Sequence, residues 1–81
     1  MEASPKTVFG RVLRRVRREH DLSQEALAAR AGLARNHVSE LERARRDPSL
    51  ATIVQLADAL DMTMAELMAR FDQERALSQG A

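Results

Sequence analysis

Arg35 and Asn36 stand side by side at the start of the segment RNHVSELER, which spans residues 35–43. The forked guanidinium of an arginine can donate two hydrogen bonds to the edge of a guanine, and the amide of an asparagine can pair with the edge of an adenine. Glu40 follows Asn36 by four residues, which puts both on one side of a helix. These residue types suit the reading of base pairs, although two solvated residues at the start of a helix would look the same.

The apolar residues recur at helical spacing in five places, which predicts an all-α domain of five helices. The first expected helix spans residues 5–19, and the second follows the N-cap Ser23 and ends at Gly32. The third is the segment 35–43. Two short helices joined by a glycine turn, the second with a polar outer side, form a helix-turn-helix pattern. A helix of this kind fits the major groove of B-DNA, where the residues of its first turn reach the bases.

The second half of the chain predicts two more helices. A fourth helix is expected after the N-cap Ser49, and a fifth after a capping box of Thr63 and Glu66. The residues of the fourth helix expected to face the core are Leu50, Ile53, Leu56, Ala57 and Leu60. We expect a single domain over residues 1–81, with an ordered core at about 5–72 and frayed ends that include the final SQGA.

Composition narrows the class of protein. The hydrophobic content is 44%, with two phenylalanines and no tyrosine or tryptophan, so the core must be mainly aliphatic, which suits helices. The absence of cysteine excludes disulfides and cysteine metal sites and fits a reducing cytoplasm. No apolar run approaches the roughly 18 residues of a membrane span, and no apolar core follows the basic N-terminal region as in a signal peptide. We therefore expect a cytoplasmic protein with no membrane partner.

The net charge of +1 conceals an asymmetry along the chain. Residues 1–46 contain 11 Lys or Arg and 6 Asp or Glu, a net charge of +5, whereas residues 47–81 contain 2 and 6, a net charge of −4. The first half therefore suits a polyanionic partner such as DNA. A solvated charged surface would give the same count.

The segment from Leu22 to Leu67, LSQEALAARAGLARNHVSELERARRDPSLATIVQLADALDMTMAEL, resembles the Cro/phage-repressor helix-turn-helix family, also called the xenobiotic-response-element family. The usual pattern of that family is LSQEELA…AGVS…ISRIERG…NPSLETL…IA.AL…..L, and the match covers over half of the chain. The resemblance implies a five-helix, lambda-repressor-like domain whose second and third helices form the helix-turn-helix. The stretch ARNHVSELERARRDPSL is most similar to the restriction–modification controllers among the small members of the family.

The resemblance also implies roles for individual residues. Base contacts are expected from Arg35, Asn36, Ser39 and Glu40. Phosphate contacts are expected from Gln24, His37, Arg43, Arg45, Arg46 and Ser49. For Gln24 the alternative is that it buttresses the third helix, and at Ser49 the amide end of the fourth helix would face the phosphate. Arg17 and Glu42 are expected to form an ion pair between the first and third helices, as they do in the family.

Three residues depart from the family pattern. Ala34 stands where a capping serine or threonine is usual, and Ala44 replaces the glycine that normally ends the third helix. Glu40 is acidic on a surface that should meet DNA. It could accept a hydrogen bond from cytosine N4, or it could orient Arg35 or Asn36 from one turn away.

Neither a metal site nor catalysis is expected. His20 and His37 have no second ligand at a suitable spacing. His37, Ser39 and Glu40 are neighbours on one short helix and cannot act as nucleophile and base across a cleft. The expected protein is not an enzyme and needs no cofactor or small-molecule ligand.

The function expected is sequence-specific transcriptional regulation by a homodimer on a partly palindromic operator, because one domain of this size reads about half a site. Met64, Met68 and Phe71 are expected at the dimer interface, and Leu67 in the core. The alternative is an antitoxin or adaptor that binds a protein partner through the fifth helix and the acidic tail, with DNA binding secondary.

Overall fold

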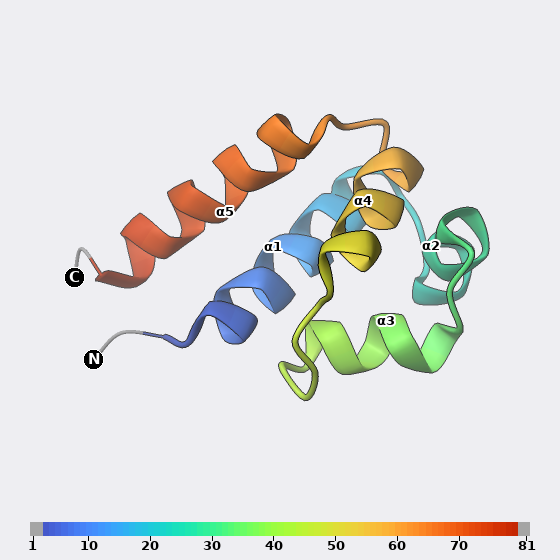
Figure 1. Ribbon diagram of the computed structural model, residues 1–81, viewed down its shortest axis with the longest axis horizontal. Coiled ribbons are helices and arrows are strands. Elements are labelled where there is room, and N and C mark those ends of the chain that lie inside the picture. The colour runs from blue at the N-terminus through green and yellow to red at the C-terminus, as the bar shows by residue number, and fades with distance from the viewer. Residues whose placement is uncertain (1–2, 80–81) are drawn as a thin grey trace.

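The computed structural model describes residues 3–79, which form five helices and no strand. The helices are α1 (Pro5–Glu19), α2 (Gln24–Ala31), α3 (Arg35–Glu42), α4 (Leu50–Ala59) and α5 (Met64–Gln79). Figure 1 shows α1 in the middle of the molecule, with α3 on one side of it and α5 on the other. The prediction of an all-α domain of five helices is confirmed. In this part of the chain, no helix has the length and apolar character needed to cross a membrane.

Hydroxyl side chains begin four of the helices. The serine N-caps, each accepting a hydrogen bond from the backbone N–H three residues later, are Ser4, Ser23 and Ser49. Thr63 and Glu66 form the expected capping box, with hydrogen bonds of 2.8 and 3.0 Å. The N-cap of α3 is Ala34, which has no side-chain acceptor. The helix that carries the candidate base-reading residues is therefore the one that lacks a side-chain cap.

The first four helices end in a left-handed turn. The residues with positive φ are Asp21 at 54°, Gly32 at 70°, Ala44 at 59° and Asp61 at 53°. After α3, the N–H of Ala44 donates to the carbonyl of Leu41 at 3.2 Å, and the N–H of Arg45 donates to the carbonyl of Glu40 at 2.9 Å. This is a Schellman motif, in which the left-handed position favours glycine because a Cβ is strained there. Arg43 caps α3, which ends at Glu42, one residue before the predicted end.

The core is made of aliphatic side chains from all five helices. The largest fully buried side chains are Leu13, Leu27, Leu41, Leu56, Leu60, Leu67, Val8, Val16 and Val38. The prediction that Leu50 faces the core is wrong, since 72% of it is exposed. Leu56 and Leu60 set the buried side of α4, and Leu50, six residues before Leu56, is rotated from it by about 120°.

Helix α5 continues to Gln79, beyond the predicted end of the ordered core near residue 72. Its apolar periodicity stops at Phe71, so the sequence offers no hydrophobic signal for the last two turns. A polar contact holds them instead, because the buried carboxylate of Glu74 accepts a hydrogen bond from Arg15 of α1. Of the expected frayed segment SQGA, the first two residues are helical and residues 80–81 lie outside the described part of the chain.

Gly10 allows α1 to touch the end of α3. A Cβ at this position would lie 2.6 Å from the carbonyl oxygen of Leu41 and 2.8 Å from that of Glu42. Both oxygens belong to the backbone and cannot turn aside as a flexible side chain could. A larger residue at position 10 would push the two helices apart.

Arg17 and Glu42 form the expected ion pair between α1 and α3. The Nε of Arg17 donates to Oε2 of Glu42 at 2.6 Å, and its Nη2 donates to Oε1 at 3.0 Å. A third donor, Nη1, bonds to the carbonyl of Leu22 at 2.8 Å, and the amide of Gln24 donates to Oε1 of Glu42 at 3.1 Å. The hydrogen bond to Glu42 raises the pKa of Arg17 above its usual value, against the opposing effect of burial. The pair thus fixes the end of α3 against α1 and the start of α2.

We expect Glu42→Ala to lower the free energy of unfolding by about 3–5 kcal/mol, because the nearly buried guanidinium of Arg17 loses its carboxylate partner. Urea unfolding followed by circular dichroism measures the change. As a control, Glu25→Ala removes an exposed glutamate from the first turn of α2 and should change stability by less than about 1 kcal/mol. Equal stability of the two variants would reduce the Arg17–Glu42 pair to a surface contact.

We expect Ala44→Gly to stabilise the domain by roughly 1 kcal/mol, because glycine adopts the left-handed conformation after α3 without Cβ strain. The midpoint of thermal unfolding reports the gain. The converse control is Gly32→Ala, which places a Cβ at φ 70° and should destabilise the domain. A loss of stability in Ala44→Gly would mean that chain entropy outweighs the strain at this turn.

Candidate nucleic-acid interface

Helices α2 and α3 form a helix-turn-helix whose turn comprises residues 32–34. Gly32, at φ 70°, ends α2, and Ala34 is in the extended conformation, with φ −75° and ψ 148°, directly before α3. Beneath the turn, Leu27 of α2 and Val38 of α3 are fully buried. The two helices therefore share the hydrophobic core and are held as one unit against the rest of the domain.

Helix α3 turns its apolar edge inward and its polar side outward. Val38 and Leu41 have no exposed surface, whereas Arg35 and Asn36 at the first turn are exposed. The partly exposed residues of the helix are His37, Ser39, Glu40 and Glu42. Figure 1 shows α3 along an edge of the molecule, away from α5. The residues predicted to read bases are thus brought together on an accessible helix.

The basic residues predicted to contact phosphates follow directly after α3. Arg43, Arg45 and Arg46 are all exposed in the segment that leads to α4. Ser49 is also exposed, but its hydroxyl accepts the N–H of Thr52 at 3.1 Å and bonds to the hydroxyl of Thr52 at 2.9 Å. Only the backbone at Ser49 is therefore left to face an anion, as the sequence analysis assumed.

Glu40 has a neighbour that the sequence analysis did not anticipate. Its Oε1 lies 3.8 Å from Nε of Arg46, and the two side chains are 43% and 49% exposed. Within residues 3–79, Glu40 makes no side-chain hydrogen bond to Arg35 or Asn36. An exposed pair at this distance contributes little stability. The pair does, however, bring the carboxylate of Glu40, a candidate base-reading group, next to the guanidinium of Arg46, a candidate phosphate-binding group.

Gln24 has a structural role in the free protein. Its side-chain amide donates to Glu42, so it supports the end of α3, which is the buttressing alternative from the sequence. An amide nitrogen carries two N–H groups, and this contact uses one of them. The second N–H remains as a donor near the start of α2.

The two histidines have separate surroundings. Nδ1 of His20 lies 2.9 Å from the carbonyl oxygen of Val16 at the end of α1, whereas His37 lies partly exposed on α3. Within residues 3–79, no three His, Asp or Glu side chains are close enough together to hold a metal ion.

A second surface, apolar in character, lies on α4 and α5, and we call it the α4–α5 surface. Leu50 and Val54 are four residues apart on α4 and are 72% and 39% exposed. Ile53, which precedes Val54 in the chain, belongs to the lining of a groove of about 250 Å³ formed by Pro5, Lys6, Phe9, Asp47, Pro48, Ile53, Met68 and Phe71. Met68 and Phe71, together with Met64, are partly buried against the core. These three residues were predicted at the dimer interface, whereas Leu50 and Val54 were not, although their spacing of four on a helix was the available signal.

Comparison with known proteins agrees with this arrangement. The chain matches the helix-turn-helix family over residues 13–67. It is 38% identical over 68 residues to the uncharacterized HTH-type transcriptional regulator y4dJ of Sinorhizobium fredii, covering 84% of this chain and 88% of that protein. It is 35% identical to the control protein C.SmaI of Serratia marcescens, covering 80% of this chain and 77% of that protein.

A solved structure extends the likeness to three dimensions. The restriction–modification controller protein C.AhdI of Aeromonas hydrophila superimposes with a TM-score of 0.74 and 45% sequence identity, covering 76% of this chain and 94% of that one. The family match spans both helices of the helix-turn-helix, and it includes the ion pair that holds α3 against α1. The chain belongs to the helix-turn-helix family of DNA-binding transcriptional regulators.

Proposed function

We propose that the protein is a sequence-specific transcriptional regulator that binds a partly palindromic operator as a homodimer, with α3 in the major groove. The observation that carries the proposal is the outer side of α3, where arginine and asparagine at the first turn are exposed while the opposite edge is fully buried. A helix held in this way can enter the groove without losing its packing. The protein would act in the cytoplasm.

Each exposed group has a proposed role set by its chemistry. Arg35, Asn36, Ser39 and Glu40 would contact base edges. Gln24, through its free N–H, His37, Arg43, Arg45, Arg46 and the backbone at Ser49 would contact phosphates. Phosphate contacts fix the position of α3 in the groove, and base contacts decide which sequence is preferred.

The homodimer is proposed from the α4–α5 surface. Leu50 and Val54 are exposed on α4, and Ile53 of the same helix lines a groove together with Met68 and Phe71 of α5. Such a surface favours association, and a two-fold pairing buries the same surface on each copy. Two copies related by this symmetry would read half-sites about 34–36 Å apart.

The relatives suggest the biological setting. C.SmaI is a control protein and C.AhdI a restriction–modification controller protein, and both match most of this chain at 35% identity or more. We propose that this protein is a controller of the same kind.

Selection of bound DNA from a random pool tests the function. We expect the enriched sequences to share an inverted repeat whose half-sites are about one helical turn apart. The matched control is the double variant Arg35→Ala/Asn36→Ala, which should enrich no common sequence. A pool without any consensus for the unaltered protein would contradict sequence-specific binding.

Glu40→Gln should bind non-specific DNA more tightly, because it removes a negative charge from the DNA-facing side and frees Arg46 from its neighbour. The same change should reduce discrimination by about 1–3 kcal/mol at one base pair. Affinities for the selected operator and its single-base variants measure both effects. In contrast, Arg45→Ala should weaken binding to all sequences alike. It should also lower the salt slope, which is the slope of log affinity against log salt concentration, by about one in magnitude. If Glu40→Gln discriminates between the operator and its single-base variants as well as the unaltered protein does, Glu40 takes no part in base recognition.

Leu50→Lys should weaken the dimer tenfold or more, since it puts a charge into an apolar interface. Leu50 is exposed in the monomer, so the fold should be retained. Sedimentation velocity over a range of concentrations measures the change. Leu77→Lys alters a side chain that is 70% exposed on the opposite side of α5 from Met68, and it should leave the dimer intact. If the two variants dimerise equally well, the α4–α5 surface is not the dimer interface.

A further inference from the structure

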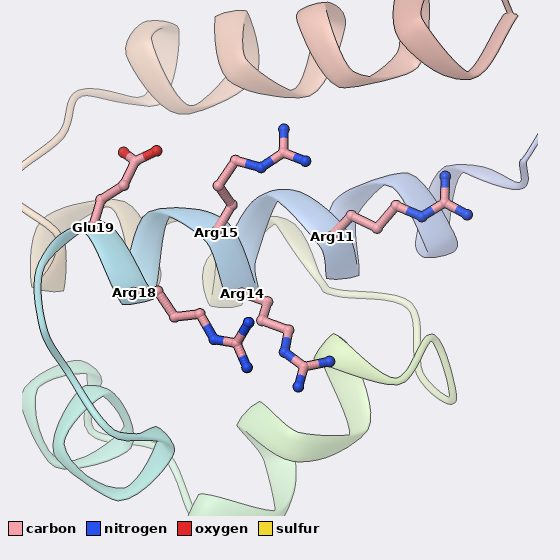
Figure 2. Close-up of a pocket in the computed structure, with 5 residues that line it drawn as sticks. All are labelled: Arg11, Arg14, Arg15, Arg18 and Glu19. Atoms are coloured by element: carbon pink, nitrogen blue, oxygen red, sulfur yellow. The ribbon is translucent and has the colours of Figure 1, made fainter.

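Helix α1 carries a row of exposed arginines, of which only Arg15 has been given a role above. Arg11, Arg14, Arg15 and Arg18, together with Glu19, line an open hollow of about 490 Å³. Figure 2 shows that the side chains leave α1 in different directions, with Arg11 extending along the helix toward its N-terminal end. Arg15 and Glu19 extend toward α5, whereas Arg14 and Arg18 extend toward the side on which α2 and α3 lie.

The charges on the α5 side are engaged within the domain. Arg15 pairs with the buried carboxylate of Glu74. Arg70 donates two hydrogen bonds, of 2.9 and 2.6 Å, to Glu19. The hydrogen bond from Arg70 lowers the pKa of Glu19, which keeps this carboxylate ionised. The contact between α1 and α5 therefore neutralises one arginine of the row.

Among the described residues, the arginines on the α3 side have no such ion-pair partners. Arg14 and Arg18 are exposed, and within residues 3–79 neither forms an ion pair or a side-chain hydrogen bond. Position 14 lies one turn after Gly10, which touches the end of α3, and position 18 lies one turn after position 14. Residues four apart on a helix have Cβ atoms about 5–6 Å apart, so the two guanidinium groups form a short cationic track.

We propose that Arg14 and Arg18 bind consecutive phosphates of the DNA strand that flanks the groove entered by α3. The track lies on the side of α1 that faces α2 and α3, and the start of α2 contributes backbone N–H groups and the positive end of its dipole. The loop after α3 supplies the other set of cations. Both sets lie near the C-terminal end of α3, because Gly10 and Arg17 of α1 contact the last two residues of α3 there. This inference rests on the proposed DNA binding and extends it to a helix outside the helix-turn-helix.

Arginine suits this role because its planar guanidinium group can donate hydrogen bonds to two phosphate oxygens at once. Contacts of this kind carry no sequence information, and each one releases about one counterion. The track should therefore contribute affinity and salt dependence while leaving the preferred sequence unchanged. An acidic protein surface could also fit two arginines, and it would leave DNA binding independent of them.

The test compares Arg14→Gln/Arg18→Gln with Arg14→Lys/Arg18→Lys, which keeps both charges. A further control is Arg75→Gln, which removes an exposed charge from α5. The affinity of each protein for its selected operator and for a scrambled duplex is measured by fluorescence anisotropy over a range of salt concentrations. Circular dichroism confirms that each variant is folded, and any variant that unfolds is replaced by the two single substitutions.

We expect the double glutamine variant to bind both duplexes about tenfold or more weakly, with the salt slope reduced by about two per protomer and the ratio between the duplexes unchanged. The lysine variant and Arg75→Gln should keep the slope of the unaltered protein. An unchanged slope in the double glutamine variant would overturn the inference while leaving the proposed function intact, and it would point to an acidic protein as the partner of the track. A changed ratio between the duplexes would also overturn it. Failure of the unaltered protein to bind DNA at all would instead remove the proposed function, and the inference with it.

Discussion

Arg17 is the charged group around which the helix-turn-helix is organised. Its guanidinium is almost entirely buried and donates to acceptors on two separate segments, Glu42 at the end of α3 and the carbonyl of Leu22 before α2. A guanidinium removed from water cannot leave such acceptors without a large loss of free energy. Three elements are therefore held in one arrangement. Gly10 adds a steric condition, because only a residue without a Cβ lets α1 come this close to the end of α3.

The way α3 ends also shapes the surface beyond it. The left-handed conformation of Ala44 reverses the chain, and the N–H of Arg45 returns to the carbonyl of Glu40. This reversal folds the basic segment back on the last turn of the helix. It explains why Arg46 lies beside Glu40 although six residues separate them in the sequence. The strained turn thus brings the candidate phosphate-binding groups to the same surface as the candidate base-reading ones.

The position of α1 between α3 and α5 divides the charge of the molecule. The first 46 residues carry a net charge of +5 and the remainder −4. Where α1 meets α5, Arg15 of α1 pairs with Glu74, and Glu19 of α1 pairs with Arg70, so each half of the chain contributes one charge of each sign. These ion pairs lie on one side of α1, so within the described residues unpaired positive charge remains on the side of α2 and α3. The proposed association and the proposed DNA binding would use different elements, α4 and α5 for the first and α3 for the second.

The sequence alone was sufficient for the five helices, their serine and threonine caps and the helix-turn-helix, and the family resemblance added the Arg17–Glu42 pair. Caps and apolar periodicity are local properties, so neighbouring residues encode them. It also located the polar side of α3, because helical geometry alone separates Val38 from Asn36 and Glu40. The tertiary structure decided the features that depend on residues distant in the chain. Leu50 is exposed because the buried side of α4 is set by its contacts with the core, and α5 extends to Gln79 because Glu74 meets Arg15 across 59 positions of sequence. Nothing in the local sequence around Gly10 predicts its close contact, because the backbone that lies against it belongs to α3. Likewise, only the packing of α1 between two helices determined which of its arginines are paired and which remain free, since a pattern of charges along one helix does not specify the partners on another.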